Sequence, residues 1–123
     1  MGQKSILIVD DDPTMCHSLA FCLKQEGFEV LVSHDGLNGL REMWERRPDL
    51  IILDLMLPAI TGEEVCKAIR EYDHPEVADV PVVMLTAKSG EVDRIVGKVI
   101  GANAYLTKPF EIDQVLVEIR KWV

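Results

Sequence analysis

Polar side chains capable of chemistry follow several short apolar segments, at the point where each segment ends. They are Asp10, Asp11 and Asp12 after residues 5–9, Asp54 after 50–53, Thr86 after 80–85 and Lys108 after 104–107. An aspartate in such a place is most often a turn or capping residue, and a single lysine or threonine says less still. Their joint occurrence at several segment ends is what indicates a site.

The charges at these positions do not balance. Asp10, Asp11 and Asp54 supply three negative charges, and Lys108 returns one positive charge. Two carboxylates about 5 Å apart repel each other by roughly 3 kcal/mol at an effective dielectric constant near 20. Such a cluster must take up a proton or bind a cation. A hard divalent ion with oxygen ligands satisfies it, most simply Mg²⁺, with Mn²⁺ as the alternative.

The same side chains are suited to phosphoryl transfer. Protein-bound Mg²⁺ usually combines one or two carboxylates with phosphate oxygens. Asp54 could act as a nucleophile and form an aspartyl phosphate. The metal and Lys108 would then stabilise the charge on the transferring group, and the Thr86 hydroxyl could donate to a phosphoryl oxygen.

Alternating strands and helices would bring these side chains together. Nearly continuous apolar segments predict strands covered on both faces, at residues 5–9, 29–33, 50–53, 80–85 and 104–107. Helical spacing predicts helices at residues 13–25, 37–47, 62–72, 89–100 and 111–123, with a loop at 73–79. We therefore expect a flavodoxin-like (βα)5 fold, a doubly wound α/β architecture. Its five-stranded parallel sheet has strand order 2-1-3-4-5 and a ligand crevice at the carboxyl ends of the strands.

Length and composition limit the remaining classes of protein. A chain of 123 residues predicts one domain over residues 1–123. The net charge of −8 disfavours direct nucleic-acid binding, and the three cysteines lack the spacing of a zinc site. No apolar run is long enough to span a bilayer, and no secretory signal is apparent. We therefore expect a cytoplasmic protein that does not contact membranes.

Four segments resemble the receiver domain of bacterial two-component response regulators. They are ILIVDDDP, PDLIILDLMLPAITG, VVMLTA and GANAYLTKPF, which occur in the family's order. The resemblance implies that Asp54 is the phosphoacceptor and that a sensor histidine kinase or histidine phosphotransfer domain supplies the phosphoryl group. It implies a signalling domain and not an enzyme, although one that assists its own phosphorylation and dephosphorylation. The output domain or partner is not implied.

The resemblance also assigns roles to individual residues. Asp10, Asp11 and Asp54 would hold Mg²⁺ together with the backbone carbonyl of Met56. The other assignments are Thr86 and Tyr105 as the switch pair, Lys108 as the phosphate-binding lysine, Pro109 after a cis peptide bond, and Met56 and Lys88 beside the path of the hydrolytic water. Methionine offers no useful hydrogen bond to orient that water, and the cationic lysine cannot accept a proton from it, so we expect a long-lived phosphoryl group.

The first helix carries a candidate docking surface for the kinase. If Met15, Leu19, Cys22 and Leu23 face the sheet, the opposite side presents Cys16, His17, Ala20 and Phe21. In the family that the sequence resembles, this helix and the loop after the fifth strand together bind the kinase's phosphotransfer domain. That loop contains Phe110 here. The alternative is that Phe21 folds over onto the last helix, near Trp122.

Two other functions compete with a phosphorylated receiver. Residues 10–14 fit the DxDxT pattern of haloacid-dehalogenase-type phosphatases, in which Asp10 would be the nucleophile and Asp12 an acid or base. That reading lacks an acidic motif after Lys108 and leaves Asp54 unexplained. The second competitor is a receiver-like interaction module that takes no phosphate. Such modules lack one or more of the acids or the lysine, whereas this sequence has them all.

Overall fold

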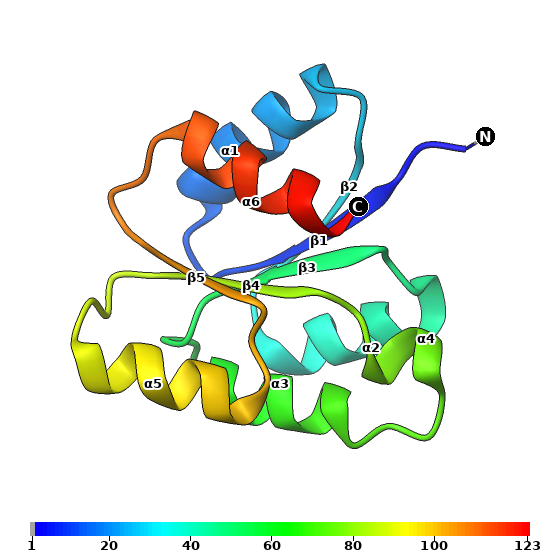
Figure 1. Cartoon of the computed structure of the whole chain (residues 1–123). Helices are drawn as coiled ribbons and strands as arrows, with labels where there is room; N and C mark the ends of the chain where they lie inside the picture. Colours follow the sequence, from blue (N-terminus) through cyan, green and yellow to red (C-terminus); the bar gives the residue numbers. More distant parts are fainter. Residues whose placement is uncertain (1) are drawn as a thin grey trace.

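Five parallel strands form the central sheet of the computed structural model, which describes residues 2–123 (Figure 1). Their order is β2-β1-β3-β4-β5, which confirms the predicted flavodoxin-like topology. The strands are β1 (Ser5–Val9), β2 (Glu29–Ser33), β3 (Leu50–Leu53), β4 (Val82–Thr86) and β5 (Ala104–Thr107). Because all five run parallel, their carboxyl ends lie at one edge of the sheet.

Helices cover both faces of the sheet. They are α1 (Pro13–Gln25), α2 (Gly36–Arg46), α3 (Gly62–Arg70), α4 (Pro75–Ala78), α5 (Glu91–Ile100) and α6 (Ile112–Trp122). Figure 1 shows α1 and α6 on one face and the other four helices on the opposite face. No helix in the described part of the chain is long and apolar enough to cross a membrane.

The central strands are apolar except for Ser5 and Thr86, because each of their faces packs on a helical layer. Successive side chains of β1 point to opposite faces. Ile6 and Ile8 join the core cluster that includes residues of α1 and α6, while Leu7 and Val9 join the cluster that includes residues of α2 and α3. The edge strands β2 and β5 are only partly buried. The prediction of coverage on both faces is therefore confirmed for the central strands alone.

Two predicted boundaries differ from the structure around the fourth strand. The short helix α4 lies in the segment 73–79, which we predicted to be a loop. Pro75 stands at the start of this helix, where its missing N–H costs nothing. The strand β4 begins at Val82 and not at residue 80, and it includes Thr86, whose pairing partner is Thr107.

The predicted orientation of α1 is only partly right, because Leu19 and Leu23 are buried as predicted whereas Met15 and Cys22 are half-buried. Cys16 and Ala20 are buried against the sheet together with Leu19 and Leu23. Residues 16, 19, 20 and 23 are spaced by three or four positions, so they form one continuous face of the helix. Cys16 and Ala20 are small, which lets the helix backbone lie close to the sheet. A pattern search that favours large apolar side chains selects the wrong face for this reason.

Candidate functional site

Three carboxylates converge where β1 and β3 end. Asp10, Asp11 and Asp54 each offer one oxygen, and these atoms lie within 4.8 Å of one another. The strand register places them: the N–H of Asp10 donates to Ser33 O and the N–H of Asp54 donates to Val9 O, both at 3.1 Å. Asp10 and Asp54 are buried, and Asp11 is exposed. The cluster predicted from the sequence is therefore present at one edge of the sheet.

Lys108 reaches the two buried carboxylates from the end of β5. Its Nζ lies 2.6 Å from Asp10 Oδ2 and 3.1 Å from Asp54 Oδ2. Its backbone N–H donates to Thr86 O at 2.8 Å, which ties the lysine to the end of β4. The following Lys108–Pro109 peptide bond is cis, as the sequence resemblance implied.

Burial and charge act against each other in this group. Burial raises the pKa of Asp10, although the hydrogen bond from Lys108 opposes that rise. Burial alone would lower the pKa of Lys108, but its hydrogen bond to Asp10 and the charge of Asp54 outweigh this, and the net pKa is raised. One ammonium group therefore serves two carboxylates, and the negative charge of Asp11 has no cation among these four groups. The site retains an excess of negative charge that a divalent cation can offset.

The segment after β3 holds Asp54 in place through its main chain. The N–H of Met56 donates to Asp54 Oδ1 at 3.0 Å, and the N–H of Gly62 donates to Leu55 O at 3.0 Å. A Cβ atom at Gly62 would lie 2.0 Å from the backbone oxygen of Asp54, so no other residue fits there without moving the backbone. The Met56 side chain is half exposed at the opening of the site.

Thr86 and Tyr105 are joined through the main chain of Lys88. The Lys88 N–H donates to Thr86 Oγ1 at 3.3 Å, and the Tyr105 hydroxyl donates to Lys88 O at 2.8 Å. Thr86 is completely buried and Tyr105 is half-buried. Burial raises the pKa of the Tyr105 hydroxyl, and the nearby charge of Asp93 adds to the effect. Two hydrogen bonds to the main chain of Lys88 thus connect the end of β4 with the Tyr105 hydroxyl.

The sequence matches one protein family along almost its whole length. Residues 6–120 match the sequence model described as the response regulator receiver domain. The chain belongs to this family. Among curated relatives, it is 41% identical over 116 residues to the sensory transduction protein RegX3 of Mycolicibacterium smegmatis, covering 94% of this chain and 49% of that protein. It is 42% identical over 118 residues to the DNA-binding response regulator MtrA of the same organism, covering 96% and 50%.

Solved structures agree with the family membership of this receiver. A putative response regulator from Chloroflexus aurantiacus superposes with a TM-score of 0.90 at 36% identity, covering 97% of this chain and 96% of that one. The chemotaxis response regulator CheY4 of Vibrio cholerae superposes with a TM-score of 0.90 at 30% identity, covering 98% and 99%. Receiver domains of this family act in two-component signalling through phosphorylation of an aspartate, which sets aside the phosphatase alternative. The chain spans about half the length of the curated relatives named above.

The predicted docking surface of the receiver is only partly available. Cys16 and Ala20 lie on the buried face of α1, so they offer very little surface to a partner. His17 is exposed, Phe21 is 59% exposed and Phe110 is half-buried. More than half of the Phe21 side chain is exposed, and the alternative in which it packs onto α6 beside Trp122 stays a prediction.

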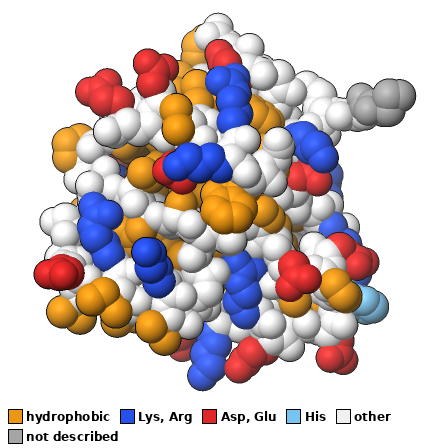
Figure 2. All heavy atoms as spheres, viewed as in Figure 1, with side chains coloured by type: hydrophobic (Ala, Val, Ile, Leu, Met, Phe, Trp, Pro, Cys, Tyr) orange, Lys and Arg blue, Asp and Glu red, His pale blue; other side chains and the backbone are white. Residues whose placement is uncertain are grey.

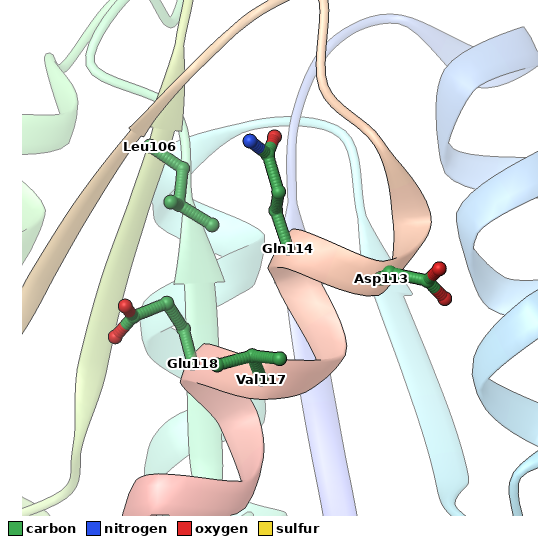
Figure 3. A pocket seen from close by; sticks show the side chains of 5 residues that line it. All are labelled: Leu106, Asp113, Gln114, Val117 and Glu118. Atoms are coloured by element: carbon green, nitrogen blue, oxygen red, sulfur yellow. The ribbon is translucent and has the colours of Figure 1, made fainter.

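Two surface features of the receiver lie outside the acidic cluster. A pocket of about 350 Å³ lies between β5 and α6 and is lined by Leu106, Asp113, Gln114, Val117 and Glu118 (Figure 3). Figure 2 shows hydrophobic side chains gathered over α5 with lysine and arginine side chains beside them. Val92, Ile95 and Val99 are the exposed apolar residues of that helix.

Sequence reasoning did not single out Gly97 or the main chain of Lys88. Gly97 lies in the interior of α5, and glycine costs about 1 kcal/mol relative to alanine in a helix. A glycine kept in a helix despite this cost could have indicated a close contact at position 97. The hydrogen bonds of Lys88 depend on its backbone, which no residue type encodes, so no sequence signal could have identified them.

Proposed function

We propose that this receiver takes a phosphoryl group from a histidine kinase, or from a histidine phosphotransfer domain, onto Asp54. The observation that carries the proposal is the contact of Lys108 with both Asp10 and Asp54, inside a cluster of three carboxylates whose oxygens lie within 4.8 Å of one another. A buried nucleophile, a cation-binding acid pair and a fixed ammonium group are the parts that phosphoryl transfer needs.

The residues of the cluster fit a bound Mg²⁺ ion. Asp10, Asp11 and Asp54 are hard oxygen donors that come together with excess negative charge. We propose that these three side chains and the backbone carbonyl of Met56 hold the ion, and that Mn²⁺ can replace it. The metal would supply charge neutralisation at the oxygens of the phosphoryl group.

Each remaining residue has a separate task in the transfer. A carboxylate oxygen of Asp54 forms the new bond to phosphorus while the bond from phosphorus to the imidazole nitrogen of the donor breaks. The Lys108 ammonium group stands 3.1 Å from Asp54 Oδ2, where it can pair with a phosphoryl oxygen. The Thr86 hydroxyl donates to another phosphoryl oxygen. The domain assists this reaction on itself and does not turn over a substrate.

Phosphorylation would change the surface formed by α5, β5 and α6. If Thr86 Oγ1 turns toward the phosphoryl group, the Lys88 N–H loses its acceptor, and the hydrogen bond from Tyr105 to Lys88 O is disturbed as well. A local contact would in this way bias an element with two positions. The partner that reads this surface is the output of the regulator, which we do not assign.

Labelling with acetyl phosphate tests the proposal. The protein is incubated with acetyl phosphate and Mg²⁺, and the modified residue is trapped and mapped. Asp54 should carry the label, and the Asp54→Ala variant should lose it. Asp113→Asn, which changes an exposed aspartate of α6, is the matched control and should label like the wild type.

Two outcomes would contradict this assignment. Labelling of Asp54→Ala at the wild-type level would remove Asp54 as the acceptor. Equal labelling of the wild type in excess chelator would remove the metal from the mechanism, because the acidic cluster would then accept a phosphoryl dianion without a cation to offset the repulsion.

A further inference from the structure

We infer that Gly97 is the positioning residue for the Tyr105 ring, and that its missing side chain leaves the space in which the ring lies. This inference rests on the proposed function, because it concerns how the switch surface of the same receiver is set.

The α5 backbone lies directly against the ring at Gly97. A Cβ atom built on Gly97 would lie 3.0 Å from Cδ2 and 3.3 Å from Cε2 of Tyr105, which is tighter than a normal carbon contact. In α5, all of whose residues the structure describes, only Gly97 is buried. The ring therefore occupies the place that a side chain at position 97 would need.

Two further contacts prevent the ring from simply moving aside. Its hydroxyl donates to Lys88 O at 2.8 Å, which ties the far end of the ring to the segment before α5. The Arg94 guanidinium lies over the ring, 5.3 Å from its centroid, and is attracted to the ring face. A methyl group at position 97 would push the ring edge away from α5 and strain the hydrogen bond at the hydroxyl end.

The position of the ring shapes a pocket on the receiver surface. A cavity of about 270 Å³ between α5 and β5 is lined by Glu91, Arg94, Ile95, Lys98 and Tyr105. Tyr105 contributes its ring to this wall only while it occupies the space beside Gly97. A substitution at Gly97 would therefore change which ring positions are populated and, with them, the surface presented to a partner.

Nuclear magnetic resonance can observe this ring with little ambiguity, because the chain has only two tyrosines. In protein made with ¹³C-labelled tyrosine, the Tyr72→Phe variant assigns the two sets of ring signals. Gly97→Ala should move the Tyr105 ring signals and leave those of Tyr72 in place. Val99→Ala is the matched control, since Val99 is 81% exposed on the same helix and its replacement also favours helix.

A binding measurement connects the ring to the switch. With Mg²⁺ present, Gly97→Ala should change the affinity for beryllofluoride by roughly threefold or more, the size expected for residues in direct contact. The same substitution in a Tyr105→Ala background should leave that affinity unchanged, because the ring it acts on is gone. Val99→Ala should leave it unchanged in both backgrounds.

The outcomes separate this inference from the proposed function. Unchanged Tyr105 signals in Gly97→Ala, or an equal change of affinity with and without the Tyr105 ring, would overturn the role of Gly97. Failure of the wild type to label on Asp54 would overturn the proposed function instead, and the resonance measurement would still decide the role of Gly97.

Discussion

Individual side chains near the acidic cluster have pKa values that differ from those of the same groups in water. Cys16 is an example, because its thiol is buried and its Sγ lies 3.4 Å from the backbone oxygen of Asp10. Burial, with the charge of Asp10 adding to it, raises the pKa of this thiol from 9.0 to about 11. The thiolate is therefore disfavoured in the folded protein and free to form in the unfolded chain.

This difference makes stability depend on pH. Between pH 9 and 11 the folded state binds the thiol proton and the unfolded chain releases it, so stability falls as pH rises through this window. From pH 8 to pH 10 the Cys16 thiol should account for a loss of about 1.4 kcal/mol in the free energy of unfolding. Urea unfolding at both values should show a smaller loss in Cys16→Ser. An equal loss in the two proteins would refute the contribution of this thiol.

The lifetime of the phosphoryl group is a second prediction at the residue scale. Met56 is half exposed beside Asp54, and Lys88 is exposed near the end of β4. Met56 offers no useful hydrogen bond to orient an attacking water, and the Lys88 ammonium group cannot accept a proton from it. The double substitution Met56→Asn with Lys88→Glu should therefore speed dephosphorylation severalfold, measured by loss of the trapped label after acetyl phosphate is removed. A rate equal to or slower than that of the wild type would contradict the prediction.

At the scale of elements, substitutions at the start of α1 can distinguish two roles for Asp12, a helix N-cap and a catalytic acid or base. Its Oδ1 accepts hydrogen bonds from the N–H groups of Thr14 at 3.0 Å and Met15 at 3.2 Å, which makes it the N-cap. Asp12→Ala should lower the free energy of unfolding by about 1 kcal/mol, while Asp12→Asn retains the cap. Both variants should still label on Asp54. Loss of labelling in Asp12→Asn would instead indicate an acid or base role.

The exposed part of α1 supports a prediction about docking. Phe21→Glu should slow phosphoryl transfer from whichever kinase of a panel phosphorylates the protein fastest. It should leave acetyl phosphate labelling and the unfolding temperature nearly unchanged, because Phe21 is 59% exposed. Ala20→Glu is the contrasting control, since Ala20 is buried and the added charge should destabilise the fold. A Phe21→Glu protein with normal kinase transfer would remove this residue from the interface.

Most strands could be predicted from sequence, including the partly buried edge strands β2 and β5. Four of the five strands have the predicted limits, because runs such as residues 50–53 are apolar on both faces and are bounded by polar residues. The face of α1 could not be predicted in the same way. Its two candidate faces share Leu19 and Leu23, and only the close approach of helix and sheet selects Cys16 over Met15. The short helix α4 was missed because four residues show no helical periodicity.

At the scale of the whole molecule, the acidic cluster should couple metal binding to stability. Folding brings Asp10, Asp11 and Asp54 together, and an ion that binds this arrangement but not the unfolded chain stabilises the fold. At a Mg²⁺ concentration ten times the dissociation constant, the free energy of unfolding should rise by about 1.4 kcal/mol. Thermal unfolding with and without Mg²⁺ measures this effect. An equal rise in Asp54→Ala would place the ion elsewhere.

The residues that form the site could be predicted from sequence, but the contacts between their atoms could not. Parallel strands must end at one edge, so Asp10, Asp54, Thr86 and Lys108 had to lie near one another once the strands were identified. That Lys108 contacts both Asp10 and Asp54 depends on side-chain geometry, which the sequence does not specify. The links through Lys88 depend on backbone groups that every residue possesses, and therefore leave no trace in the residue types.

The distance along the chain between Lys108 and Asp10 has a consequence for biosynthesis. The two residues are 98 positions apart, and the ribosome makes them in the order acid first and lysine last. A nascent chain that has reached only the end of β4 already possesses all three carboxylates, yet it lacks Lys108, whose ammonium group contacts two of them in the folded domain. During translation the growing chain thus passes through a stage in which Lys108 cannot yet offset the charge of these carboxylates. The site proposed for phosphoryl transfer is therefore complete only once the residue that follows the last strand has been made.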